Sequence, residues 1–127
     1  MVSTIDTLVD GPQNLVIHVE GTVAVAAELI IDVSGLSTAG GLTCTSVRLD
    51  RFTYDSDMTS AVLLWDATAN TRAWGFGPGT SDNVSWKDFG GLQNNSGTGK
   101  TGDVLLTVTA AAGTHYSFTL ECTKKYN

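Results

Sequence analysis

The chain has 127 residues, which fits one compact domain and excludes a two-domain architecture. Hydrophobic residues make up 42% and charged residues 16%, so the chain can form a core and is neither a disordered tail nor a coiled coil. Seven Lys and Arg against thirteen Asp and Glu give a net charge of −6, which argues against binding to a phosphate backbone, and we expect no nucleic-acid partner.

The N-terminal region carries no targeting pattern. Residues 1–6 lack the basic start and the long apolar stretch of a secretory signal, so we expect a protein that is not exported. Residues 1–12 are a candidate N-terminal arm. The longest mostly apolar stretch, residues 22–31, is well under the roughly 20 residues that span a bilayer, and we expect no membrane insertion.

Short β-patterned runs bounded by turn residues begin at residue 14. Residues 14–20 are a β-branched run between Gly11-Pro12 and Gly21, and residues 28–34 predict the next strand. A helix over residues 22–31 is the competing interpretation. Three Ala favour that helix, whereas two Val and the short length weaken it.

The middle of the chain predicts a bent strand and then a central strand. Residues 45–50 alternate with their apolar side chains on one face, and Phe52 and Tyr54 fall on the opposite parity. That shift predicts a bulge or kink near Arg51. Residues 58–65 are apolar on both parities, which is typical of a strand covered on both faces, in a central or interface position.

The second half predicts four further strands. Residues 72–76 and 83–86 are two short candidates around a Gly-Pro-Gly turn signal, and we expect them to pair as a hairpin. Residues 90–102 contain almost nothing that could be buried and predict an exposed loop. Residues 103–109 and 115–122 alternate, and in the latter Tyr116, Phe118, Leu120 and Cys122 share one face.

These runs predict an all-β protein, an antiparallel β-sandwich or jelly roll of about eight short strands. We expect less than about a tenth of the residues in helix, because period-two alternations outnumber helical matches. Fourteen Gly, 18 Thr and 10 Ser against two Pro agree with a turn-rich β protein.

Motifs that could carry chemistry are weak. Gly99-Lys100-Thr101 resembles the end of a phosphate-binding loop, but Asn94 stands where the pattern needs Gly, and a strand follows where it needs a helix. His18 and His115 lie in strand patterns without a local nucleophile motif, although a triad could assemble from distant positions. We expect no catalytic residues, no cofactor and no enzymatic activity.

Metal sites are not expected either. Asp55 and Asp57 have an alternate carboxylate spacing, but no further acidic ligands follow at the offsets of a calcium loop. Cys44 and Cys122 are too far apart for a zinc site. We expect them to be buried free thiols, with a disulfide as the alternative.

Aromatic residues concentrate in one third of the chain. Such a cluster can be ordinary core, a subunit interface or a sugar-stacking platform, because Trp offers a large area and an N–H donor. The residues considered for an interface are Trp65, Trp74, Phe76, Trp86, Phe89 and Leu92.

Three segments resemble small β-rich structural proteins of tailed-bacteriophage virions. They are residues 8–16 (LVDGPQNLV), 64–68 (LWDAT) and 89–95 (FGGLQNN) running into 99–103 (GKTGD). The resemblance covers nearly the whole chain and includes no catalytic motif.

The resemblance implies a virion protein assembled in the bacterial host cytoplasm. The first role that the resemblance implies is that of a capsid decoration or cement protein on the head shell, and the alternative role is attachment at the neck, tail or fibre. The implied partners are further copies of the chain, with a homotrimer as one symmetric arrangement, and a major capsid or other virion protein. A carbohydrate-binding module that uses the tryptophans is the rival from another class.

Overall fold

The computed structural model describes residues 3–22, 24–38, 40–56, 60–76, 81–109 and 115–126. Within these ranges the chain forms nine strands and two short 3-10 helices, and no α-helix. No helix in these ranges is long and apolar enough to cross a membrane. The strands are β1 (Thr4–Asp10), β2 (Asn14–Gly21), β3 (Val25–Ile31), β4 (Cys44–Ser56), β5 (Ser60–Trp65), β6 (Thr71–Phe76), β7 (Ser81–Ser85), β8 (Val104–Thr109) and β9 (Tyr116–Tyr126), and the 3-10 helices are η1 (Val33–Gly35) and η2 (Lys87–Phe89).

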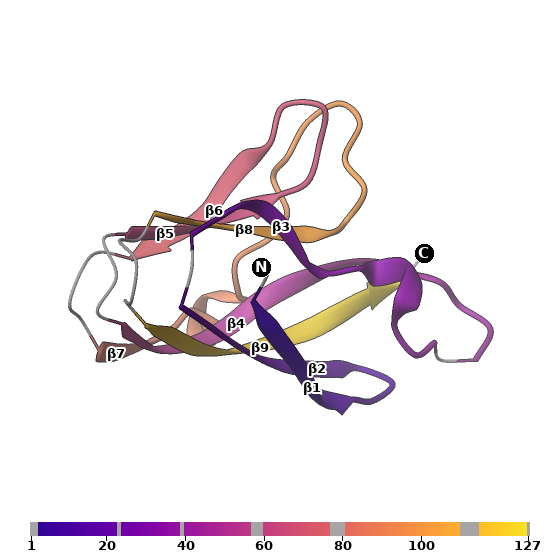
Figure 1. The fold of residues 1–127 in the computed structure, drawn as a ribbon. Coiled ribbons are helices and arrows are strands. Elements are labelled where there is room, and N and C mark those ends of the chain that lie inside the picture. The colour runs from indigo at the N-terminus through magenta and orange to yellow at the C-terminus, as the bar shows by residue number, and fades with distance from the viewer. Residues whose placement is uncertain are drawn as a thin grey trace.

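The strands form two antiparallel sheets that pack face to face (Figure 1). One sheet has the order β1-β2-β9-β4-β7 and the other the order β3-β8-β5-β6. Among the strands of the described residues, only β1–β2 and β5–β6 are pairs of consecutive strands, and the other pairings join distant segments. The expected all-β sandwich or jelly roll is confirmed, with nine strands in the described residues rather than about eight.

The core lies between the sheets and follows the alternation of the strands. Tyr116, Phe118, Leu120 and Cys122 of β9 are buried, as their shared parity predicts. The opposing sheet contributes Val104, Leu106 and Val108 of β8 and Ala61, Leu63 and Trp65 of β5. As expected, β5 is central, between β8 and β6, and its outward Val62 and Leu64 are half-buried.

The predicted bulge in β4 is confirmed. Leu49 pairs with Cys122 and Arg51 with Glu121, so Asp50 is the additional residue on β4. An inserted residue reverses the parity of all that follow. Leu49 and Phe52 are therefore both fully buried.

The N-terminal region differs from expectation. Thr4–Asp10 forms edge strand β1 of the five-stranded sheet rather than an arm. Ser3 is buried, its backbone N–H donates to the Glu28 carboxylate, and its hydroxyl lies 2.5 Å from the Tyr116 hydroxyl. These contacts fix the start of the chain to both sheets.

The segment before η1 is a strand, so the competing helix prediction is wrong. β3 begins before the predicted residue 28 and ends at Ile31 rather than at residue 34. The next residue, Asp32, accepts a hydrogen bond from the backbone N–H of Ser34 and so caps η1. The strand is favoured over the helix because pairing with β8 satisfies the backbone hydrogen-bonding groups of this segment and buries Ile30 and Ile31.

The predicted hairpin between residues 72–76 and 83–86 is wrong. β6 pairs with β5, and β7 pairs with β4 in the other sheet. The turn signal between them, residues 77–79, lies outside the described residues. A turn signal is local, whereas the choice of partner strand follows from which sheet can bury each side chain.

The segment 90–102 is less exposed than its composition predicts. Leu92 and Leu49 exchange backbone hydrogen bonds of 2.8 and 3.0 Å, and Ser96 is buried. Gly102 has φ +89° and lies so close to β4 that a Cβ there would be 1.9 Å from the carbonyl oxygen of Thr45. This segment is therefore a loop that is held to the rest of the fold at several points, and we call residues 90–102 the anchored loop.

The two cysteines are free and buried, as expected. Cys122 lies opposite Leu49 in β4, while Cys44 lies opposite Tyr126 in β9. These positions are four residue steps apart along β9, or about 13 Å at the rise of a strand, so the two cysteines are too far apart for a disulfide.

Candidate interaction surface

Two tryptophans lie between the free edges of the two sheets. Trp74 is on β6, the edge of the four-stranded sheet, and Trp86 follows β7, the edge of the five-stranded sheet. Their ring centroids are 5.1 Å apart at 70°, an edge-to-face arrangement. Both side chains are half-buried, so they fill this side of the sandwich and leave part of their surface to solvent.

Phe89 extends from this side into solvent. The carbonyl oxygen of Trp86 accepts the backbone N–H groups of Phe89 and Gly91, both at 2.9 Å, which winds the chain into η2. Gly90 and Gly91 follow with positive φ values of 84° and 77°, where glycine is favoured. Phe89 is 87% exposed on this turn. We call Trp74, Trp86 and Phe89 the aromatic edge.

A hollow of about 530 Å³ lies along β5 and β6 beside the aromatic edge. Its lining includes Trp74, Val62 and Arg72. The indole Nε1 of Trp74 is buried and has no hydrogen-bond acceptor among the described residues. An unsatisfied buried donor of this kind costs about 1–3 kcal/mol.

The other residues considered for an interface are placed differently. Trp65 is 1% exposed and belongs to the core, so its assignment to an interface is wrong. Its inward parity on β5, shared with Ala61 and Leu63, decides this. Leu92 is half-buried against the core, and the side chain of Phe76 lies outside the described residues.

Sequence reasoning missed a second set of exposed apolar side chains. Leu8 and Val9 of β1 are 57% and 46% exposed, and Leu29 of β3 and Leu42 are 45% and 49% exposed. Leu29 pairs with Leu105, which pairs with Leu64, so apolar residues form a row on the outer face of the four-stranded sheet. The two-sided apolar pattern of β5 was the signal for this row.

His18 lies in a polar cluster on the outer face of the five-stranded sheet. Its Nε2 is 3.2 Å from the Ser117 hydroxyl and 3.1 Å from a Glu20 carboxylate oxygen, and its Nδ1 is 3.1 Å from the Thr119 hydroxyl. A catalytic triad needs its nucleophile and acid on opposite ring nitrogens. Ser117 and Glu20 share Nε2, and neither hollow described here is lined by His18.

Among the described residues, the other candidate metal ligands do not lie close together. Within the described part of the chain, no group of three or more His, Cys, Asp or Glu side chains could hold a metal ion. Asp55 lies in β4, and Asp57 is outside the described residues. Residues 99–101 lead into strand β8, so a helix N-terminus does not follow the phosphate-loop resemblance.

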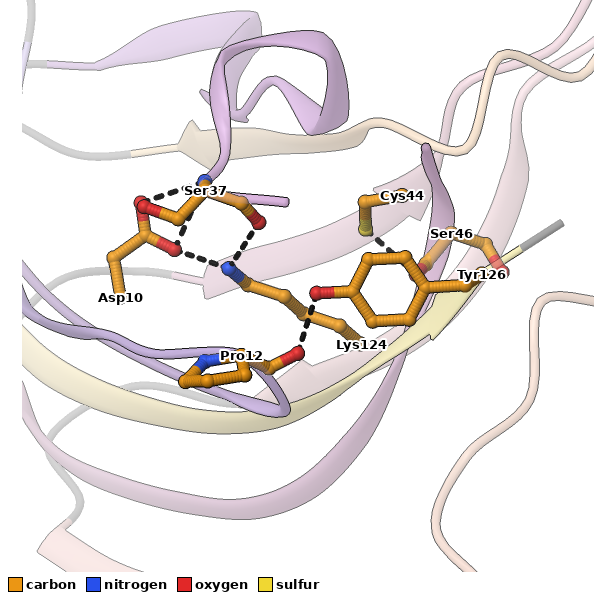
Figure 2. Close-up of polar contacts among 7 residues, drawn as sticks. All are labelled: Asp10, Pro12, Ser37, Cys44, Ser46, Lys124 and Tyr126. Atoms are coloured by element: carbon orange, nitrogen blue, oxygen red, sulfur yellow. Dashed lines mark hydrogen bonds and ion pairs between the residues drawn. The ribbon is translucent and has the colours of Figure 1, made fainter. Parts of the chain in front are cut away.

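A buried ion pair joins the first and last strands (Figure 2). The Lys124 side chain has no exposed surface, and its Nζ donates to the Asp10 carboxylate and, at 2.9 Å, to the Ser37 carbonyl. The backbone N–H and hydroxyl of Ser37 also donate to Asp10. Burial on its own would raise the pKa of Asp10, but the hydrogen bonds from Lys124 and Ser37 lower this pKa below its usual value.

No protein-family model matches the chain, and no curated protein matches it. Solved structures with some similarity include a cupin domain from Bordetella pertussis Tohama I, at 12% identity and a TM-score of 0.32 over 98% of this chain and 94% of that one. A family 29 carbohydrate-binding module has 9% identity and a TM-score of 0.43 over 98% and 90%.

The cobalt form of HppE in complex with Tris buffer has 10% identity and a TM-score of 0.36, and the match covers 95% of this chain but only 54% of that one. Similarities at these levels carry no argument about what this chain does.

Proposed function

We propose that this chain is a non-enzymatic structural protein of a tailed-bacteriophage virion, which associates with itself and docks on a larger assembly through the aromatic edge. A decoration or cement protein of the head shell is the first choice, and attachment at the neck, tail or fibre is the alternative. The exposure of Phe89 is the observation that supports this docking surface. Full burial of such a side chain contributes about 1.5–3 kcal/mol, and here the chain exposes it on a hydrogen-bonded turn.

The positions of the three segments that resemble virion proteins support this proposal. Residues 8–16 span the β1–β2 hairpin, with Leu8 exposed. The other two segments contact each other, since the Thr101 N–H donates to the Asp66 carbonyl at 3.2 Å. Many identical copies that each bury a modest area can stabilise a lattice by multivalent contact.

A tryptophan-based carbohydrate module is less well supported. Such a module needs an exposed, flat aromatic platform. Trp65 is buried, and Trp74 and Trp86 meet edge to face between the sheets.

Self-association tests the docking surface. Sedimentation velocity over a range of concentrations would compare the wild type with Phe89→Ser and with the matched control Leu42→Ser, which also removes an exposed apolar side chain. We expect Phe89→Ser to weaken association about 10- to 100-fold, the equivalent of burying one Phe, at unchanged unfolding stability. Leu42→Ser should associate like the wild type.

A protein that stays monomeric at all concentrations, or equal losses in the two variants, would contradict a docking role for Phe89. Membership of the virion has a separate test. We expect a capsid or portal gene beside the gene of this protein, and its peptides in the mass spectrum of purified particles. Absence from those particles would contradict the virion proposal, and polysaccharide binding with quenched tryptophan fluorescence would replace it.

A further inference from the structure

A second hollow, of about 630 Å³, lies at another part of the molecule. It is formed by η1, the start of β4, the anchored loop and the end of β9, so segments from four parts of the chain meet there. Figure 1 shows η1 close to the C-terminus at this end of the sandwich. The volume is in the range of small-molecule sites. We call it the lysine hollow, after Lys100 and Lys125 in its lining.

The two charged side chains that line the lysine hollow are both basic, although the chain as a whole is acidic. Lys100 and Lys125 line the hollow, and no Asp or Glu does among the described residues. The chain as a whole has thirteen acidic and seven basic residues. Lys125 donates through Nζ to the Gln93 amide oxygen, which holds its ammonium group at the wall. The carboxylates of Asp32, Asp66 and Asp103 accept hydrogen bonds from the lining residues Ser34, Thr101 and Val33, but they do not themselves line the hollow. A ligand inside the hollow meets the two ammonium groups directly, which favours an anionic ligand over a neutral one.

The remaining lining is rich in neutral hydrogen-bonding groups. Five lining residues carry a hydroxyl, namely Ser34, Thr43, Thr45, Ser46 and Thr101. Two carboxamides, of Gln93 and Asn94, add to them. The Asn94 Oδ1 accepts the N–H and the hydroxyl of Ser96, whereas its Nδ2 is buried without an acceptor among the described residues. Among the described residues no aromatic side chain lines the hollow, so a ligand here is held by polar contacts rather than by stacking.

The walls of the hollow are held in place without a ligand. The close approach of Gly102 to β4 fixes one side of the loop, and the Leu92–Leu49 bridge fixes its beginning. The Thr101 hydroxyl donates to the Asp66 carboxylate at 2.8 Å. A preformed site loses less conformational entropy on binding than a mobile one.

We propose that the lysine hollow binds an acidic sugar, a uronic acid residue of a saccharide. Lys100 and Lys125 pair with the sugar carboxylate, and the hydroxyls of Thr43 and Ser46 and the Nδ2 of Asn94 bind the ring hydroxyls. This site is separate from the aromatic edge and does not depend on the proposed virion role. Binding requires no covalent step and no cofactor.

Calorimetric titration with digalacturonic acid tests the proposal, with neutral galactobiose and inorganic phosphate as comparison ligands. We expect digalacturonic acid to bind about tenfold or more tightly than either, because only this ligand offers both the charge and the hydroxyls. Added salt should weaken the binding, since exposed charges are screened.

Two variants locate the site. The double variant Lys100→Gln/Lys125→Gln should lose about tenfold or more in affinity for digalacturonic acid at unchanged stability. The control Lys87→Gln removes one exposed cation from η2, outside the hollow, and should bind like the wild type. Failure of the folded wild type to bind, equal affinity for phosphate or galactobiose, or an equal loss in Lys87→Gln would each overturn the proposal.

Discussion

Replacing Asp10 with Asn would leave the ammonium group of Lys124 inside the sandwich without its counter-ion. The Lys124 side chain is 0% exposed, whereas the Asp10 side chain is 24% exposed. Removing one partner of a buried ion pair costs about 3–5 kcal/mol, because the remaining charge is uncompensated. Since the Ser37 carbonyl still accepts from Lys124, we expect Asp10→Asn to cost about 3 kcal/mol, the lower end of that range.

Replacing the other partner of the ion pair, Lys124, should cost less unfolding free energy. Lys124→Met fills much the same volume with apolar atoms and leaves Asp10 in contact with water and with the two donors of Ser37. We expect a loss of less than about 1.5 kcal/mol, because the charge that remains, on Asp10, is partly exposed and keeps its Ser37 donors, so that no charge is left buried and uncompensated. Urea unfolding at pH 7 measures both. Equal losses in Asp10→Asn and Lys124→Met would refute the assignment of the cost to the buried ammonium.

The same pair predicts a pH dependence with a definite sign. Because the pKa of Asp10 is lowered in the folded protein, its stabilising contribution is complete above the ordinary value of 3.8 and is lost as the pH falls below it. The difference in unfolding free energy between the wild type and Asp10→Asn should therefore shrink below pH 3.8. A difference that stays constant into the acid range would show that the carboxylate charge does not stabilise the fold.

Three further outcomes follow from the core and the anchored loop. Phe118→Ala and Leu120→Ala should each cost about 2–5 kcal/mol, and an unchanged denaturation midpoint would contradict their burial. Gly102→Ala should lower the melting temperature more than Gly97→Ala, because a Cβ at 97 meets nothing within 4 Å while one at 102 meets a carbonyl oxygen at 1.9 Å. Burial raises the pKa of the Cys122 thiol, so iodoacetamide should label it only after unfolding, as intact mass would show, and rapid labelling of the folded protein would contradict this.

Parity along single strands was the part of the fold that the sequence could predict. Alternation in β9 identified its buried face, and the change of parity between Leu49 and Phe52 located the bulge. Both are local signals, because the side-chain period of a strand is two residues and an inserted residue reverses it.

Strand pairing could not be predicted in the same way. The chain passes between the sheets after β2, β3, β4, β6, β7 and β8, so most partners are distant in sequence. A turn signal after β6 indicated a hairpin, but it holds no information on whether β5 or β7 is the better partner. That choice depends on burial across the whole sheet.

The candidate sites could likewise be predicted only in part, because they too depend on residues that are distant in the sequence. The parity of Trp65 with Ala61 and Leu63 already indicated a buried position, and the same reasoning places Lys124 on the inward face of β9. The exposure of Phe89 depends on η2, which no sequence period marks. The lysine hollow needs four separate segments, so its composition becomes visible only when they are brought together.

The edges of the two sheets at β1 and β3 are irregular, which disfavours association by strand addition there. A free strand edge invites pairing with another chain, and proteins suppress it with bulges and irregular register. Edge strand β1 has a register shift between Thr7 and Val9, and edge strand β3 has two, the first of which includes Ala27 with its positive φ of 49°. On the opposite side, the Trp74–Trp86 contact covers the gap between β6 and β7. Phe89 follows Trp86 on this side and is the most exposed large apolar side chain among the described residues, so the Phe89→Ser variant is the sharpest test of the docking proposal.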